Sequence, residues 1–110
     1  MDSFTIVIPD TNAHNLHDLL VTADAAKSDP KGLSLITQFT ELLLLSDSGN
    51  GANHINVGGS DISDTVYSYQ LQAGGNKQYR VPSRGQKVFA KELYIKAVAG
   101  TPTLHVEGLV

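Results

Sequence analysis

The chain has 110 residues, no cysteine, a hydrophobic fraction of 41% and a formal net charge of −3. Its length predicts a single domain over residues 1–110, with enough apolar material for one core. The absence of cysteine excludes disulfides, thiolate catalysis and cysteine-based zinc sites. The acidic balance and the thinly spread Lys and Arg count against a protein that binds nucleic acid.

The N-terminal part predicts a strand followed by a short helix. Residues 4–8 are rich in β-branched and aromatic residues, and Pro9 ends this run because it cannot donate to a β-ladder. Asn15 then predicts a helix N-cap, and Asp18 lies where the positive end of the helix dipole favours an acidic residue. Apolar residues recur after the cap at helical spacing: Leu16, Leu19, Leu20 and Ala23. We expect this helix to end by residues 29–32.

From Ser34 the apolar period changes to two, and residues 36–45 predict one long strand. Four consecutive leucines make this strand apolar on both faces. Such a strand either lies between two layers or has one face covered by a partner subunit. We therefore name as interface candidates four leucines and two C-terminal residues: Leu42, Leu43, Leu44, Leu45, Leu109 and Val110. The alternative, that they complete the core of the monomer, is equally compatible with the sequence.

The rest of the chain predicts short strands separated by turns rich in Gly, Asn and Ser. In residues 67–73 the alternation places Tyr67 and Tyr69 on the same face as Leu71, in the core or in an interface. Further strands are predicted at residues 54–57, 77–81, 86–90, 93–97 and 104–107. We expect an all-β fold, an antiparallel β-sandwich or jelly roll of seven to eight strands with one short N-terminal helix.

No catalytic or metal-binding pattern emerges from the polar residues. The plausible bases near neutral pH are the histidines His14, His17, His54 and His105. The first two lie at the helix start without a third ligand nearby, which favours a solvated helix start, and the others predict surface or contact positions. Asp61 and Asp64 form the best carboxylate pair, with neither an apolar pocket nor a cationic partner visible in the sequence. We expect no catalytic residue, no metal and no cofactor, and hence no enzyme. The longest apolar runs are also too short to span a membrane.

Several short phrases carry a family resemblance. They are residues 56–63 (Asn-Val-Gly-Gly-Ser-Asp-Ile-Ser), 69–75 (Tyr-Gln-Leu-Gln-Ala-Gly-Gly), 93–97 (Leu-Tyr-Ile-Lys-Ala) and 100–106 (Gly-Thr-Pro-Thr-Leu-His-Val). Together with the helix start at 15–20, they resemble small structural proteins of tailed bacteriophages, the head decoration or cement-like β-sandwiches. The resemblance implies a virion component, made in the host cytoplasm, that forms homo-oligomers and contacts other virion proteins such as a capsid protein. It implies neither nucleic acid nor membrane as a partner.

Two hypotheses about function follow. The first is a bacteriophage virion structural protein, a capsid decoration or cement protein or another head, neck or tail component, that acts through protein–protein contacts. The alternative is a carbohydrate-binding β-sandwich module, which needs solvent-facing aromatic residues such as Tyr94. The aromatic fraction of 6% and the absence of Trp count against this alternative.

Overall fold

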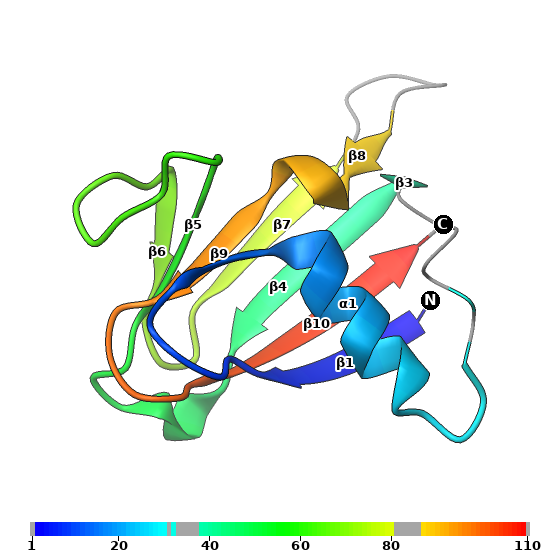
Figure 1. Ribbon diagram of the computed structural model, residues 1–110, viewed down its shortest axis with the longest axis horizontal. Coiled ribbons are helices and arrows are strands. Elements are labelled where there is room, and N and C mark those ends of the chain that lie inside the picture. The colour runs from blue at the N-terminus through cyan, green and yellow to red at the C-terminus, as the bar shows by residue number, and fades with distance from the viewer. Residues whose placement is uncertain (1, 31, 33–37, 81–86, 110) are drawn as a thin grey trace.

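The computed structural model describes residues 2–30, 32, 38–80 and 87–109. The described chain is mostly β, with antiparallel sheets and one α-helix (Figure 1). The first sheet has the strand order β1-β10-β4-β7. Its strands are β1 (Asp2–Val7), β10 (Thr103–Leu109), β4 (Glu41–Ser46) and β7 (Asn76–Arg80).

The second sheet has the strand order β2-β9-β5-β6. Its strands are β2 (Ala13–Asn15), β9 (Tyr94–Ala97), β5 (Ile55–Gly58) and β6 (Tyr69–Leu71). A third, two-stranded sheet pairs β3 (Gln38–Phe39) with β8 (Val88–Phe89). The helix is α1 (Leu16–Ala25), and two short 3-10 turns are η1 (Ser48–Asn50) and η2 (Ala90–Glu92).

The all-β, antiparallel class that the sequence predicts is confirmed, whereas the predicted count of seven to eight strands is not. The described residues contain ten strands. The difference comes from β2, which was not predicted, and from β3, which is separate from β4 although residues 36–45 were predicted as one strand; β2 and β3 have three and two residues. Segments this short are too brief to show the alternation on which a sequence-based prediction depends.

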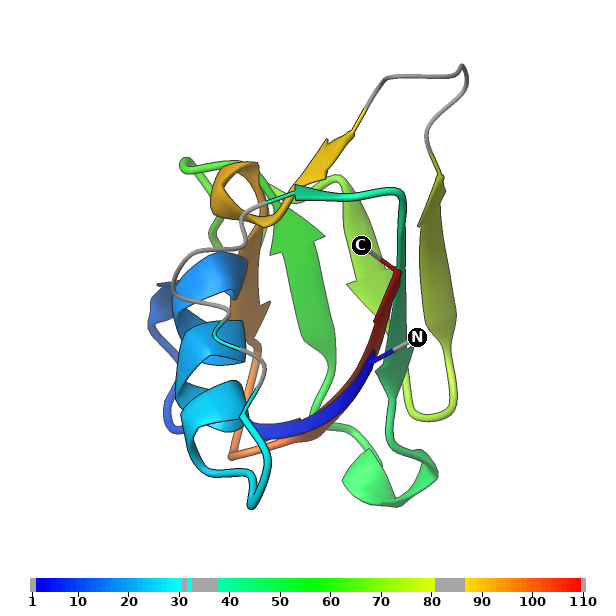
Figure 2. The same cartoon turned by 90° about the vertical axis from the view of Figure 1, so that its right-hand side faces the viewer.

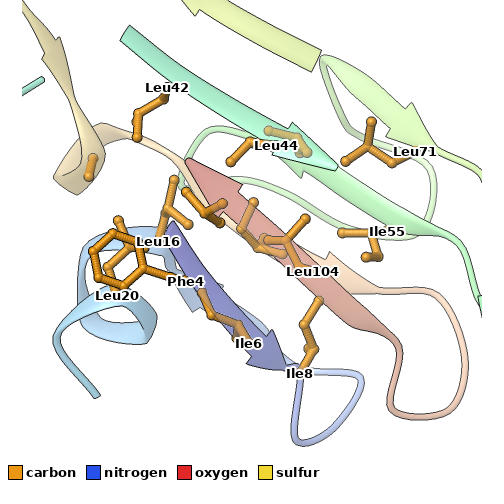
Figure 3. Close-up of a cluster of buried hydrophobic side chains, with 14 of the residues drawn as sticks. Phe4, Ile6, Ile8, Leu16, Leu20, Leu42, Leu44, Ile55, Leu71 and Leu104 are labelled. Carbon is orange, nitrogen blue, oxygen red and sulfur yellow. The ribbon is translucent and has the colours of Figure 1, made fainter. Parts of the chain in front are cut away.

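The core forms where the first sheet faces the second sheet and α1. Alternate residues of β1, β10 and β4 point to this side, and their register places Ile6 opposite Leu104 and Val106 opposite Leu44. Figure 3 shows side chains from these strands, from α1 and from the second sheet converging in one cluster. Burial of each large apolar side chain contributes about 1.5–3 kcal/mol to folding. This single cluster is the main source of stability in a chain without disulfides.

The helix begins as the sequence predicts. The Asn15 side chain accepts a hydrogen bond from the His17 backbone N–H at 3.0 Å, which satisfies one of the free donors of the first turn. Its amide group also donates to the Lys91 carbonyl at 2.7 Å, so the cap fixes α1 to η2. Leu16 and Leu20 are fully buried. The helix ends at Ala25, before the predicted residues 29–32.

The long strand predicted over residues 36–45 is divided in the structure. Residues 36 and 37 lie outside the described residues, and the rest forms β3 and β4 with Thr40 between them. The Thr40 backbone N–H and hydroxyl both donate to the Leu109 carbonyl, at 2.7 Å and 3.0 Å. This anchor lets β3 leave the first sheet and pair with β8. The prediction of one continuous strand was therefore wrong.

Phe39 packs on the bare backbone of β10. This ring is only 1% exposed, and a Cβ built on Gly108 would lie 2.8 Å from Phe39 Cε1 and 2.9 Å from its Cδ1. Real side chains do not tolerate such approaches, because contacts between carbon atoms are optimal at about 3.5–4.0 Å. Glycine at position 108 is therefore required by close packing.

We expect Gly108→Ala to lower the free energy of unfolding by about 1–3 kcal/mol, the usual cost of overpacking a core. Urea denaturation of the two proteins measures the difference. Gly59→Ala is the control, because the nearest atom to its Cβ would be Asp61 Oδ1 at 3.5 Å, an ordinary contact. If the cause is overpacking, adding Phe39→Leu to Gly108→Ala will cost less than the two single changes added together. Additive losses would contradict this explanation.

Candidate functional site

The structure divides the four leucines of β4 between two faces. Leu42 and Leu44 are fully buried in the core, whereas Leu43 and Leu45 are half-buried on the opposite face of the sheet. The sequence left open whether these leucines contact a partner or complete the core of the monomer. Leu42 and Leu44 complete the core, and no partner can reach them in the folded chain. Leu109 is 41% exposed, and Val110 lies outside the described residues.

Leu43, Leu45 and Leu109 form an outer leucine strip on the first sheet. Register places Glu107 beside Leu43 and His105 beside Leu45, with Leu109 opposite Glu41. Leu43 and Leu109 are thus diagonal neighbours, roughly 7–8 Å apart in such a ladder. In Figure 2, α1 (blue) and the outer face of this sheet lie on opposite sides of β10 (red). The strip occupies a face that neither α1 nor the second sheet covers.

A hydrogen-bonded Thr–His–Asp cluster lies next to the strip. His105 Nδ1 is 3.3 Å from Thr5 Oγ1, and His105 Nε2 is 2.8 Å from Asp47 Oδ1. The hydrogen bond from His105, followed by one from the Gly49 backbone N–H at 2.8 Å, lowers the pKa of the Asp47 carboxyl below its ordinary value. The sequence placed His105 on the outward face and did not predict these partners.

This cluster has the order of groups that activates a hydroxyl nucleophile: a hydroxyl, an imidazole and a carboxylate. It lies on the surface of a sheet. Thr5 is among the residues that line the first hollow described below, whereas His105 and Asp47 line neither of the two. Asp47 also accepts the Gly49 hydrogen bond that begins η1. The geometry therefore fits a tie between the β4–β5 connection and β10.

The two histidines at the helix start have different surroundings. His14 Nε2 is 2.7 Å from Asp10 Oδ1. The Asn12 backbone N–H first, and then His14, lower the pKa of Asp10 through hydrogen bonds. His17 is only 6% exposed, so the prediction of a solvated helix start was wrong for this residue. The Leu16 backbone N–H donates to the Leu93 carbonyl at 2.8 Å, and this contact brings the first turn of α1 against the body of the protein.

The loop of residues 59–68 covers part of the second sheet, and two polar contacts hold it there. Asn56 is fully buried, although the alternation of β5 predicted an outward position; its amide donates to the Ser63 carbonyl at 3.0 Å. The other end of the Asn56 amide is satisfied by the neighbouring strand β6, where the Gln70 amide donates to Asn56 Oδ1 at 2.8 Å. Asp64 forms an ion pair with Lys96, a cationic partner that the sequence did not reveal. These residues therefore have structural roles.

The described part of the chain includes the following two hollows. The first, of about 460 Å³, lies between β1 and α1 and is lined mainly by apolar side chains with His14 and Asp18. The second, of about 440 Å³, is lined by Ser68, Tyr69, Lys77, Tyr79, Glu92 and Leu93, with the backbone of residues 58–59; we call it the tyrosine hollow. Both volumes fall within the range of roughly 300–1,000 Å³ that is usual for small-molecule sites.

Of the two environments predicted for Tyr67 and Tyr69, the core or an interface, the structure excludes the core. Tyr67 is 43% exposed and Tyr69 is 42% exposed, so neither belongs to the core, although Leu71 on the same strand is fully buried. The cause is the shortness of β6, which leaves residue 67 in a loop and residue 69 at a sheet edge. Tyr94, the predicted sugar-binding residue, is half-buried and does not line the tyrosine hollow.

Comparison with protein-family models, with curated proteins and with solved structures finds no match for this chain. Within the described residues, no three His, Asp or Glu side chains gather closely enough to hold a metal ion. No helix in the described part of the chain is long and apolar enough to cross a membrane.

We expect the Asp47 contact to make stability depend on pH in the acid range. Because the folded-state pKa of Asp47 lies below the ordinary value of about 3.8, its contribution is complete above that pH and is lost as the pH falls through the folded-state pKa. The difference in urea midpoint between wild type and Asp47→Asn should therefore shrink as the pH is lowered from about 5 to 2.

His105→Gln provides the control for this prediction. In that background Asp47→Asn should have a much smaller effect, since both changes remove the same hydrogen bond. A constant difference between wild type and Asp47→Asn across the acid range would contradict the assignment.

Proposed function

We propose that this chain is a non-catalytic structural protein of a bacteriophage particle. It is a two-sheet β-sandwich that acts through contacts with copies of itself and with other virion proteins such as a capsid protein. The outer leucine strip carries this proposal, because it is an apolar surface on a sheet face where, Val7 apart, the neighbouring outward residues are polar. The short phrases in the C-terminal half that resemble tailed-phage structural proteins support the same class.

The strip is difficult to explain by the needs of the monomer. An uncovered face of an antiparallel sheet is normally polar, and the core uses only the inward leucines of β4. Leucines at positions 43 and 45 reduce their contact with water only if another surface covers them. Exposed apolar patches with a polar rim are typical of protein–protein contact sites.

A second copy of the chain fits this surface. Polar residues border the strip, among them Ser3, Asn76 and Glu107, as expected for the rim of an interface. Two copies related by a two-fold axis would place strip against strip. The molecule extends 35 × 33 Å across its two longer axes, so this face is broad enough for a standard contact of about 800 Å² per partner.

The polar clusters also favour a role without catalysis. The Thr5–His105–Asp47 cluster lies on an open sheet surface, and Asp64 is held by Lys96. Repeated contacts between identical subunits can stabilise a shell without chemistry, because many weak contacts act together. A second candidate function, binding of carbohydrate, has its own observation in the tyrosine hollow and is argued in the next subsection.

We expect the wild type to form a discrete oligomer and Leu43→Asp/Leu45→Asp to be a folded monomer. Two carboxylates on the strip would have to lose their water in the interface, which costs far more than the contact gains. Size exclusion with light scattering over a range of concentrations measures the mass, and circular dichroism confirms the fold.

The charge-matched control is Ser60→Asp/Ala99→Asp, which adds the same two charges at exposed positions outside the strip and should remain oligomeric. Leu42→Asp should unfold the chain instead, because this side chain is fully buried. A wild type that stays monomeric up to its solubility limit would contradict self-association through the strip.

A further inference from the structure

The tyrosine hollow lies where the two sheets separate. β6 is an edge strand of the second sheet and β7 is an edge strand of the first. Residues 72–75 join the two strands at one end, and the strands diverge from this turn (Figure 2). Tyr69 begins β6 and Tyr79 is the next-to-last residue of β7, so both lie at the end away from the turn. The opening of the sandwich edge thus creates the hollow, and an aromatic side chain from each sheet lines it.

The Lys77 ammonium group lies close to the rings of both Tyr69 and Tyr79. Lys77 Nζ lies 5.4 Å from the centroid of the Tyr69 ring and 5.5 Å from that of Tyr79. These distances are within the range for cation–π attraction, which holds the ammonium group between the rings. Tyr69 is 42% exposed and Tyr79 is half-buried. Burial raises the pKa of the Tyr79 phenol, which keeps this group protonated and able to donate a hydrogen bond at neutral pH.

An acceptor lies in the same hollow as this donor. Glu92, from η2, lines the hollow, and the described ion pairs do not include one between Glu92 and Lys77. The ammonium group can only donate hydrogen bonds, and the ionised carboxylate can only accept them. The hollow is therefore lined by hydrogen-bond donors, by an acceptor and by two aromatic rings.

An inward-pointing lysine on an edge strand also has a structural explanation, because such charges prevent pairing with another sheet. Lys77 fits this description, since register places it beside Leu44 on the inner side of the first sheet. Protection of the edge does not require two partly exposed tyrosines, however, nor a glutamate that forms no ion pair with the residues that the structure describes. These additional groups indicate a ligand.

The combination of groups selects the chemistry of this ligand. The attraction of an anion by Lys77 is opposed by repulsion from Glu92, and the attraction of a cation by Glu92 is opposed by repulsion from Lys77, so neither sign of net charge is favoured. A hydrocarbon would leave both charged groups without hydrogen bonds once water was displaced. A sugar ring has C–H faces that pack on aromatic rings and hydroxyls that both donate and accept. We propose that the tyrosine hollow binds a monosaccharide unit of a neutral carbohydrate.

The test uses the wild-type chain and a panel of neutral oligosaccharides of glucose, galactose, mannose and N-acetylglucosamine. Saturation-transfer NMR at up to about 10 mM sugar detects affinities in the millimolar range. The protein has no Trp, so quenching of its tyrosine fluorescence provides a second measurement. We expect at least one neutral sugar to bind, with its C–H protons saturated from the aromatic signals.

A matched pair of variants, Tyr69→Ala and Tyr67→Ala, tests the location of the site, and three further variants test the roles of single groups. Tyr69→Ala should weaken binding by about tenfold or more, because it removes one aromatic wall. Tyr67→Ala should leave binding unchanged, since Tyr67 is equally exposed but does not line the hollow. Tyr69→Phe should retain most of the binding, which separates loss of the ring from loss of folding. Lys77→Gln and Glu92→Gln should each weaken binding while the fold persists.

Three outcomes would overturn the proposal. The first is no saturation transfer to any sugar of the panel. The second is binding of glucuronate, glucosamine or a hexose phosphate without binding of neutral sugars, because the charge argument would then be wrong. The third is equal loss in Tyr67→Ala and Tyr69→Ala, which would place the ligand elsewhere.

Discussion

The pairing of β10 with both β1 and β4 is the constraint on which the rest of the structure depends. β10 is central in the first sheet, and its alternation sends Leu104 and Val106 into the core while His105 and Glu107 face outward. A shift of one residue in this register would exchange the two faces completely. Register is fixed further by Gly108, where only a bare backbone leaves room for the Phe39 ring. The outer leucine strip and the Thr5–His105–Asp47 cluster are both consequences of this one alignment.

The sequence predicted those parts of the fold that depend on local pattern. Asn15 was identified as a cap because its side chain needs only the next turn of backbone, and the inward residues Leu104 and Val106 of β10 follow from alternation. The strand break at Thr40 was not predictable, because its cause is the Leu109 carbonyl, distant in the chain. The outward, exposed position predicted for Asn56 was wrong for a similar reason. Its outward face is covered by a loop, and contacts with Ser63 and Gln70 satisfy its amide group.

The candidate sites were predictable only in part. Four adjacent leucines indicated a two-faced strand, but only the register shows that Leu43 and Leu45 share their face with Leu109. The tyrosine hollow depends on how two edge strands diverge, and no residue spacing contains this information. Alternation along 67–73 left both the core and an interface open for Tyr69, because the period says only which side of a strand a residue occupies. It does not say whether a neighbouring strand covers that side.

The two proposed surfaces are compatible, and together they offer a physical reason for assembly. The outer leucine strip lies on the outer face of the first sheet, whereas the tyrosine hollow opens at the edge between β6 and β7. Self-association through the strip would therefore leave the hollow accessible in every copy. A shallow site with two aromatic walls and a few hydrogen bonds binds a single sugar weakly, because most of the ligand stays in contact with water. Several such sites on one particle would engage a repetitive carbohydrate surface at once, and the second and later contacts would then form at a high effective concentration. If both proposals hold, weak binding by one chain would make adhesion depend on assembly, because only an assembled surface would present enough sites to bind firmly.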